Sequence, residues 1–251
     1  MNNKICKIKY LFIFLSLIFV LISGCEKKVD DIEKTETKDE EIVEEIIESI
    51  NIDDVTDPAE RNQLLRIDHI NQTFGKDMVV TKDDYYKYRD TKFCIIGDSI
   101  AKGAEASLLK YFRAATIDAT PGREIKKVYD IFSSLYAFNR LGDLVIVSLG
   151  TNAIEGIEMK LLDDVYNRLE GRPMFLLTIV MPYKGQERNR NRDIRKFVES
   201  HENCYLIDYN KIMKPHPELF NDDHIHPNGA GGEVYAQLLF KSIADYKKTH
   251  K

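Results

Sequence analysis

A serine, an aspartate and a histidine occur in this sequence at positions where they could together attack an ester. The serine is Ser99, in the sequence Gly97-Asp98-Ser99 that directly follows the apolar run Phe93–Ile96. An isolated serine hydroxyl is a poor nucleophile near neutral pH, so a neighbouring base must take its proton during attack. Histidine usually does this, while a carboxylate bonded to its second ring nitrogen fixes the tautomer. Ser99 is our candidate nucleophile; the alternative is a serine that only caps a helix.

The candidate base and its carboxylate lie near the C-terminus, in the segment Asn221–Gly229. This segment contains Asp222, Asp223, His224 and His226. From the residues alone, either histidine could be the base and either aspartate its partner. The four side chains could also resemble a metal site, but a serine-histidine-aspartate arrangement explains two of them without a metal. We therefore expect neither a metal nor a cofactor.

Two further loops contain groups that could stabilise the anion formed on an attacked carbonyl. Gly122 follows the short apolar run Ala115–Asp118, and Asn152 follows the apolar run Leu144–Leu149. Glycine and asparagine are also ordinary turn residues, so each alone is a weak signal. The carboxyl ends of parallel strands meet at one edge of a sheet, however, and ligands bind there. The joint placement of these residues predicts one site.

The elements that must position these residues alternate between strand and helix. This alternation implies a parallel sheet with helices on both faces, in an α/β domain. We expect strands over Phe93–Ile96, Ala115–Asp118, Leu144–Leu149, Met174–Val180 and Tyr205–Ile207, with helices over Glu105–Phe112, Glu124–Phe138, Met159–Leu169, Asp193–His201 and Gly229–Tyr246.

The order and content of these blocks resemble the SGNH (GDSL-like) hydrolase family. Gly97–Ser99 matches the family's first block, and Gly122 matches the glycine of its second block. Gly150–Asn152 matches the Gly-x-Asn of the third block. Asp223 and His226 match the Asp-x-x-His of the fifth block. The resemblance extends over about residues 92–246.

This resemblance implies a fold and a role for each matched residue. The fold would be a three-layer α/β/α sandwich around a five-stranded parallel sheet in the flavodoxin-like order 2-1-3-4-5. Ser99 would be the nucleophile, His226 its base and Asp223 the carboxylate, in preference to the neighbouring histidine and aspartate. The backbone N–H groups of Ser99 and Gly122 and the side-chain amide of Asn152 would form the oxyanion hole.

Three longer segments are similar to the SGNH domain of bacterial peptidoglycan O-acetyltransferases: DATPGRE (118–124), LGTN (149–152) and HPELFNDDHIHPNGA (216–230). The similarity implies a serine esterase or acyltransferase acting on O-acetyl groups of a cell-envelope glycan through an acyl-serine. A separate membrane protein could supply the acyl group, since such domains usually follow a membrane acyltransferase part. The alternatives are a small-ester or lipid esterase, or a non-catalytic surface-binding lipoprotein. The sequence has no pattern typical of a nucleic-acid-binding module.

The first 24 residues are typical of a secretory signal peptide. Lysines precede the apolar run Tyr10–Ile22, which is too short for an ordinary membrane-spanning helix. The run leads into Ser23-Gly24-Cys25, which resembles the lipobox of bacterial lipoproteins and implies lipidation of the Cys25 thiol. The alternative is an N-terminal anchor helix with an incidental cysteine. In either case we expect the protein to work outside the cytoplasmic membrane, attached through its N-terminus.

The next segment, residues 26–60, contains 15 acidic residues, 4 lysines and no aromatic residue. Such a composition buries too little apolar surface to offset the entropy of ordering, so we expect residues 25–60 to be a disordered acidic tether. The formal net charge of the whole chain is −5, so the remainder is mildly basic. We expect residues 61–91 to be an N-terminal extension packed against the catalytic domain, residues 92–251.

Two cysteines, Cys94 and Cys204, lie in the expected first and fifth strands. In the order 2-1-3-4-5 these strands are three steps apart, which is roughly 14 Å. A disulfide needs Cα atoms within about 7 Å. We therefore expect two separate buried thiols.

The segment Met181–Arg192 follows the fourth expected strand, so it lies on the same rim as the motifs. We expect its charged residues to belong mostly to a solvated loop and the start of a helix. The alternative is a substrate-contacting rim, in which Tyr183 stacks on a sugar and an arginine binds a carboxylate.

Overall fold

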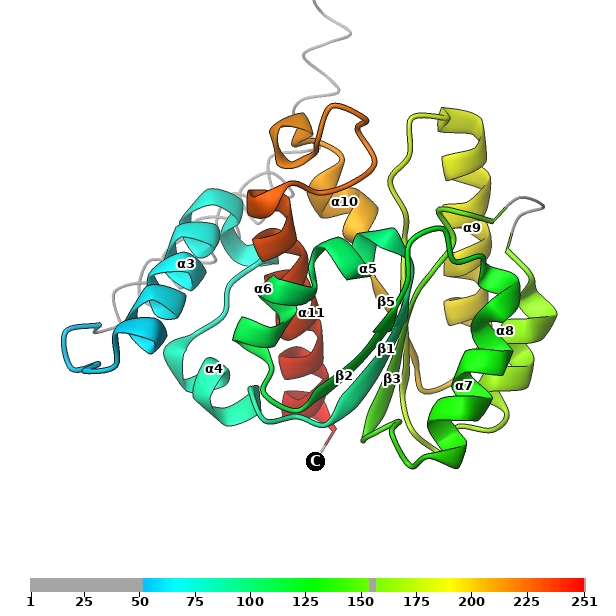
Figure 1. The fold of residues 1–251 in the computed structure, drawn as a ribbon, viewed down its shortest axis with the longest axis horizontal. Helices are drawn as coiled ribbons and strands as arrows, with labels where there is room; N and C mark the ends of the chain where they lie inside the picture. Colours follow the sequence, from blue (N-terminus) through cyan, green and yellow to red (C-terminus); the bar gives the residue numbers. More distant parts are fainter. Residues whose placement is uncertain (1–51, 154–156, 251) are drawn as a thin grey trace, which may run out of the picture. The chain divides into compact units, whose positions relative to one another are not determined.

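A computed structural model describes residues 52–153 and 157–250, which form a three-layer α/β/α sandwich (Figure 1). The parallel sheet has the order β2-β1-β3-β4-β5, so the expected fold and strand order are confirmed. The signal peptide, Cys25 and most of the expected tether lie outside the described residues. The strands are β1 Phe93–Gly97, β2 Ala115–Ala119, β3 Leu144–Ser148, β4 Met174–Leu177 and β5 Cys204–Ile207.

The middle of the sheet is formed by β1 and β3, which are buried along their whole length. Phe93 is in register with Ala115 of β2 on one side and with Leu144 of β3 on the other. Strands buried on both faces need apolar side chains at successive positions, as both sequences have. The carboxyl end of β1 therefore lies between the ends of β2 and β3, where the candidate motifs follow.

Helices cover both faces of the sheet (Figure 1). One face is covered by α6 and α11, with α3 and α4 packed beside α11; the other face carries α7, α8 and α9. The long helices are α3 Pro58–Phe74, α4 Lys82–Tyr88, α6 Glu105–Tyr111, α7 Val128–Ala137, α8 Met159–Tyr166, α9 Lys184–Ser200 and α11 Gly229–Thr249. The short ones are α5 Ser99–Gly103, α10 Tyr209–Met213 and the 3-10 turns η1 Gly75–Asp77, η2 Ile125–Lys127 and η3 Pro217–Leu219.

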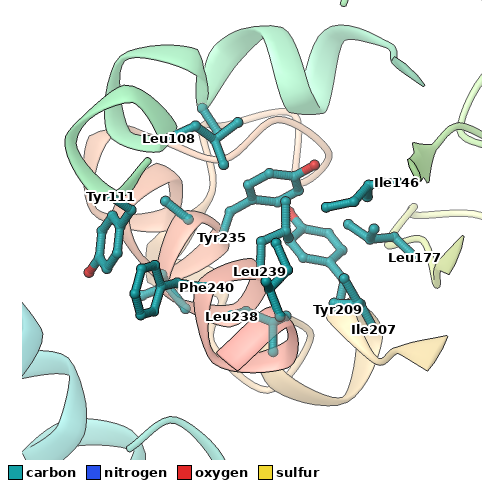
Figure 2. Close-up of a cluster of buried hydrophobic side chains, with 14 of the residues drawn as sticks. Leu108, Tyr111, Ile146, Leu177, Ile207, Tyr209, Tyr235, Leu238, Leu239 and Phe240 are labelled. Carbon is teal, nitrogen blue, oxygen red and sulfur yellow. The ribbon is translucent and has the colours of Figure 1, made fainter. Parts of the chain in front are cut away.

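The larger core is built around α11, whose side chains lie against the sheet and α6 (Figure 2). Tyr235, Leu239 and Phe240 of α11 are fully buried. Burying a large apolar side chain contributes about 1.5–3 kcal/mol, so docking of α11 supplies much of the stability on this face. None of the helices within the described ranges is long and apolar enough to span a membrane.

The folded domain includes residues that precede the boundary expected at residue 60. Asp57 caps α3, because its Oδ1 accepts the N–H groups of Ala59 at 2.7 Å and Glu60 at 3.1 Å. Glu60 then accepts hydrogen bonds from Arg89 at 2.6 Å and Arg113 at 2.8 Å. The end of the expected tether therefore belongs to the folded domain, and the boundary at residue 60 is corrected.

Both cysteines of the domain are buried and free, as expected. Cys94 lies in β1 beside Val145 of β3, and Cys204 lies in β5 beside Met174 of β4. Burial raises the pKa of each thiol to about 12. The two side chains therefore act as small apolar groups and not as reactive thiols.

Candidate active site

Ser99 is held at the sharp turn between β1 and α5. Asp98 caps this helix, because its Oδ1 accepts the Ile100 N–H at 3.0 Å. Gly97 allows the helix to approach the strand closely: a Cβ at this position would lie 2.4 Å from the Cβ of Ala101. The tight strand-to-helix turn thus explains Gly97 and Asp98, and it leaves Ser99 at the carboxyl edge of the sheet.

A continuous hydrogen-bond chain links Ser99, His226 and Asp223. The Ser99 Oγ lies 2.8 Å from His226 Nε2, and His226 Nδ1 lies 2.6 Å from Asp223 Oδ2. The other oxygen, Oδ1, accepts the backbone N–H groups of His226 and Ile225, each at 2.9 Å. The hydrogen bond from the imidazole, followed by these two backbone bonds, lowers the pKa of Asp223 to about 2. An ionised Asp223 favours the tautomer in which Nδ1 carries the proton and Nε2 accepts from the serine.

The two histidines and the two aspartates of this loop differ in their contacts. His224 has a positive φ of 54° and is exposed, as is Asp222. Neither side chain makes a hydrogen bond within the described residues, whereas His226 faces Ser99. In the same part of the chain, no group of three or more His, Cys, Asp or Glu side chains is placed to hold a metal ion.

The loop that carries His226 is fixed at both ends by local hydrogen bonds. The Asn221 N–H donates to the His226 carbonyl oxygen at 2.9 Å, which closes the loop. Asn228 caps α11 by accepting the Gly231 N–H at 3.0 Å, and its amide donates to the Glu218 carbonyl at 2.7 Å. The loop that carries the imidazole is therefore fixed next to the first turn of α11.

The two expected oxyanion residues lie in loops after β2 and β3. Gly122 has a positive φ of 73°, a conformation that favours glycine. The Asn152 amide donates to the carbonyl oxygen of Arg123 at 3.4 Å, which links the two loops. The Arg123 guanidinium in turn donates to the Gly97 carbonyl at 3.0 Å and to Asp118 Oδ1 at 2.7 Å. One arginine therefore ties the loop after β2 to the end of β1.

A second arginine, Arg190, holds the loop that carries Asn152. Its guanidinium donates to the carbonyl oxygens of Gly150 and Thr151, each at 2.9 Å, and also to that of Ala153. The residue is only 7% exposed and has no carboxylate partner within the described residues. Burial accordingly lowers the pKa of Arg190. Two weaker contacts go to Met181 Sδ and Gln186 Oε1, but the shorter hydrogen bonds go to the backbone of one loop, so Arg190 helps to fix the path of that loop.

Sequence reasoning missed this role because the start of α9 looked like a solvated loop. The helix begins at Lys184 and not near Asp193. Its first turns bury polar residues that bind backbone groups: Glu187 accepts the Met181 N–H at 2.9 Å. Asn191 likewise accepts the N–H of Ile179 at 2.7 Å and donates to its carbonyl at 2.9 Å. The helical spacing of Glu187, Arg190 and Asn191 is present in the sequence, but the residue types alone do not reveal that they are buried.

The chain is similar to known proteins in sequence and in fold. No protein-family profile matches the sequence. The O-acetyltransferase OatA of Staphylococcus aureus is 29% identical over 159 residues, which cover 62% of this chain and 26% of that relative. The chain thus spans about a quarter of the length of the curated relatives it matches. The resemblance to the SGNH-type hydrolases is confirmed.

Solved structures show the same fold. The C-terminal catalytic domain of Streptococcus pneumoniae peptidoglycan O-acetyltransferase A has a TM-score of 0.57 at 22% identity, covering 63% of this chain and 96% of that domain. A family 3 carbohydrate esterase of Clostridium thermocellum has a TM-score of 0.52 at 15% identity, covering 62% and 98%. A GDSL-like lipase of Bacteroides thetaiotaomicron has a TM-score of 0.51 at 12% identity, covering 75% and 98%.

A buried polar layer lies under the SGNH-like site. Asp98 is 1% exposed, and its second oxygen, Oδ2, has no hydrogen-bond partner within the described residues. Burial therefore raises the pKa of Asp98 to about 6. The Tyr235 hydroxyl donates to Ser148 Oγ at 2.9 Å in the same layer. Ionisation of Asp98, which precedes the candidate nucleophile, is therefore unfavourable because burial removes the carboxylate from water.

Proposed function

We propose that this protein is a serine esterase or O-acetyltransferase that acts on O-acetyl groups of peptidoglycan or a related cell-envelope glycan. The observation that carries the proposal is the hydrogen-bond chain from Ser99 Oγ through His226 to Asp223. The names of the similar proteins support it: peptidoglycan O-acetyltransferases and carbohydrate esterases transfer or cleave ester-linked groups. The proposed chemistry uses side chains and backbone N–H groups of this protein.

In the first step, Ser99 attacks the carbonyl carbon of the acetyl ester. His226 Nε2 takes the hydroxyl proton as the bond to carbon forms, and the resulting imidazolium is stabilised by ionised Asp223. The C–O bond to the leaving alcohol then breaks, and the imidazolium gives its proton to that oxygen. The acetyl group remains on Ser99 as an ester.

The negative charge on the attacked carbonyl oxygen needs preorganised donors. We assign this role to the backbone N–H groups of Ser99 and Gly122 and to the Asn152 amide, each at the end of a neighbouring strand. Losing one such donor raises the barrier by about 3–4 kcal/mol in comparable enzymes. Arg123 and Arg190 position the two loops that carry Gly122 and Asn152.

In the second step, a hydroxyl group attacks the acetyl-serine. His226 takes the proton of that hydroxyl and returns it to Ser99 Oγ as the acetyl group departs. A sugar hydroxyl as acceptor completes a transfer, and water completes a hydrolysis. Exclusion of water and placement of the acceptor decide between these outcomes.

We also propose that the protein is exported and anchored by lipid at Cys25, with residues 26–56 as an acidic tether. The basis is the lysine-containing start, the short apolar run and the Ser-Gly-Cys sequence that follows it. Detergent-extracted protein should begin at Cys25 with added acyl mass. An unmodified N-terminus elsewhere contradicts the anchor. A membrane protein that donates acyl groups is a partner consistent with this location.

A chromogenic acetyl ester tests the nucleophile directly. Ser99→Ala should abolish turnover while the variant keeps the unfolding temperature of the parent, whereas Ser134→Ala on α7 should leave turnover unchanged. Retained turnover in Ser99→Ala excludes nucleophilic catalysis by this residue, whereas absence of turnover in the wild type favours a non-catalytic binding role. Adding chito-oligosaccharide acceptors and following product mass then separates transfer from hydrolysis. A chelator should leave the rate unchanged.

A further inference from the structure

A groove between α9 and α10 is lined entirely by polar and charged side chains. It has a volume of about 670 Å³. Six basic residues line it, against two acidic ones, Glu187 and Glu199. The basic residues are Lys184, Arg188, Arg192, Arg195, Lys196 and Lys214. This surface is separate from the Ser99 site, and the proposed acyl transfer does not use it.

Four of these basic residues form a row along one face of α9. Lys184, Arg188, Arg192 and Lys196 are spaced four residues apart, so neighbours lie about 6 Å apart and the row is about 18 Å long. Like charges one helical turn apart destabilise a helix. Mutual repulsion within this row therefore destabilises α9 and does not contribute to its stability.

Half of the basic side chains in the groove form no ion pair within the described residues. Three of the six bind carboxylates of the domain. These pairs are Arg192 with Asp193 at 2.9 Å, Arg195 with Asp208 at 2.7 Å, and Lys214 with Glu187. In the described part of the chain, the other three make no ion pair: Lys184, Arg188 and Lys196. Their charges are free to neutralise an external ligand.

One end of the groove lies at the carboxyl edge of the sheet, where Ser99 also lies. The helix α9 follows the carboxyl end of β4, and α10 follows that of β5 (Figure 1). Tyr183, the residue before Lys184, is 63% exposed at the start of α9. A chain-like ligand in the groove would therefore be held beside the catalytic edge.

We propose that this groove binds a linear polyanion whose negative charges repeat along its length, as in a phosphodiester polymer. The length of the row favours a polymer, because a single small anion would contact only one or two of its cations. The concave shape and the absence of apolar lining side chains disfavour a lipid surface, since interfacial binding needs apolar groups beside the charges. The groove would hold the protein on an anionic polymer independently of acyl transfer.

The test measures binding of the full chain to poly(glycerol phosphate) at increasing sodium chloride concentrations. The variant K184Q/R188Q/K196Q removes the three unpaired cations without leaving a carboxylate unpaired. The control K87Q/K92Q/R140Q removes the same charge from exposed positions away from the groove. Neutral dextran and vesicles of anionic phospholipid serve as further ligands, and thermal unfolding confirms that each variant is folded.

For the wild type we expect a dissociation constant that rises steeply with salt, and no binding to dextran. The groove variant should reduce the slope of log Kd against log salt by about 2, since each neutralised phosphate contributes about 0.7 for a single-stranded polyanion. The control should keep the wild-type slope. Equal effects of both variants, no binding of the polymer, or vesicle binding as the only activity lost in the groove variant would overturn the proposal. Turnover of the small ester is measured in parallel, so that failure here is distinguishable from failure of the proposed catalysis.

Discussion

Arg190 donates a hydrogen bond to the Gly150 carbonyl oxygen at 2.9 Å, although the two residues lie 40 positions apart in the chain. The contact joins α9 to the loop after β3, which carries Asn152. A buried guanidinium without a carboxylate is costly, because burial disfavours its charge. Hydrogen bonds to carbonyl oxygens of the loop offset this cost, so the side chain fixes the loop at the expense of its own hydration.

Replacing Arg190 by lysine should lower kcat on a small acetyl ester on the order of 100-fold while changing KM little. Lysine keeps the charge but loses the planar fork that reaches several carbonyls, and small displacements of catalytic groups cost rates of this size. Steady-state kinetics gives the split between kcat and KM. Arg192→Lys, an exposed neighbour on α9, is the control. Added guanidinium should partly restore the turnover of a second variant, Arg190→Ala. A loss of kcat that is accompanied by a loss of stability and is not rescued indicates a purely structural role.

Asn152→Ala should reduce turnover on the order of 100-fold, because it removes one donor to the developing oxyanion. Asn167→Ala, at the exposed end of α8, should have no effect. The measurement is kcat/KM for the acetyl ester at one pH. An unchanged value for Asn152→Ala removes this residue from the oxyanion hole.

The two histidines of the catalytic loop provide a matched pair. His226→Asn should reduce turnover by at least about 10³-fold, since Ser99 then has no base. His224→Asn should be close to wild type, because asparagine tolerates the positive φ of 54° at this position. Both are assayed with the same ester. If His224→Asn is the inactive variant, the assignment of the base is wrong.

Asp98 should make the domain less stable as the pH rises from about 4 to 6. Its pKa is raised by burial to about 6 in the folded state, against about 3.9 in an unfolded chain. The folded protein therefore holds the proton more tightly in this window, and the penalty for ionisation is complete above pH 6. It amounts to about 3 kcal/mol for this shift. Asp98→Asn should lose this slope, measured as the difference in unfolding free energy between pH 4 and pH 7.5. A variant destabilised equally at both pH values contradicts the assignment.

Cys94 and Cys204 should both be alkylated when the protein is unfolded without reductant. Both are free and buried, and two strands separate β1 from β5. In the native protein they should react slowly, because burial raises the pKa of each thiol to about 12. Peptide mass spectrometry reads each site separately. A Cys94–Cys204 disulfide would contradict the strand order as well.

The strands and their order were predictable because apolar runs such as Leu144–Ser148 are buried on both faces. The contact between Ser99 and His226 followed from matching blocks of sequence. The early start of α9 was missed, since hydrophobic periodicity gives no signal where a helix buries Glu187 and Arg190. Their partners are backbone groups elsewhere in the chain, which residue types do not reveal.

The beginning of α3 was missed for a similar reason. Residues 26–60 are strongly acidic overall, and this average hid a local start signal: Asp57 followed by Pro58 is a good helix cap and first residue. Glu60 was counted as part of the charged tether, but Arg89 and Arg113 bind it. The average composition of residues 26–60 therefore does not predict the structure of its last residues, because hydrogen bonds to other parts of the domain hold them in place.

The separation of 127 positions between Ser99 and His226 has a consequence for biogenesis. The nucleophile is formed near the start of the sheet, while its base stands just before α11, the helix that completes one face of the core. Closing so long a loop is entropically unfavourable until the final helix docks. A chain that ends before α11, or is still being synthesised, either lacks His226 or lacks the helix that holds it against Ser99. Ester turnover therefore reports only completed molecules, and it can serve as a quantitative measure of full-length folding.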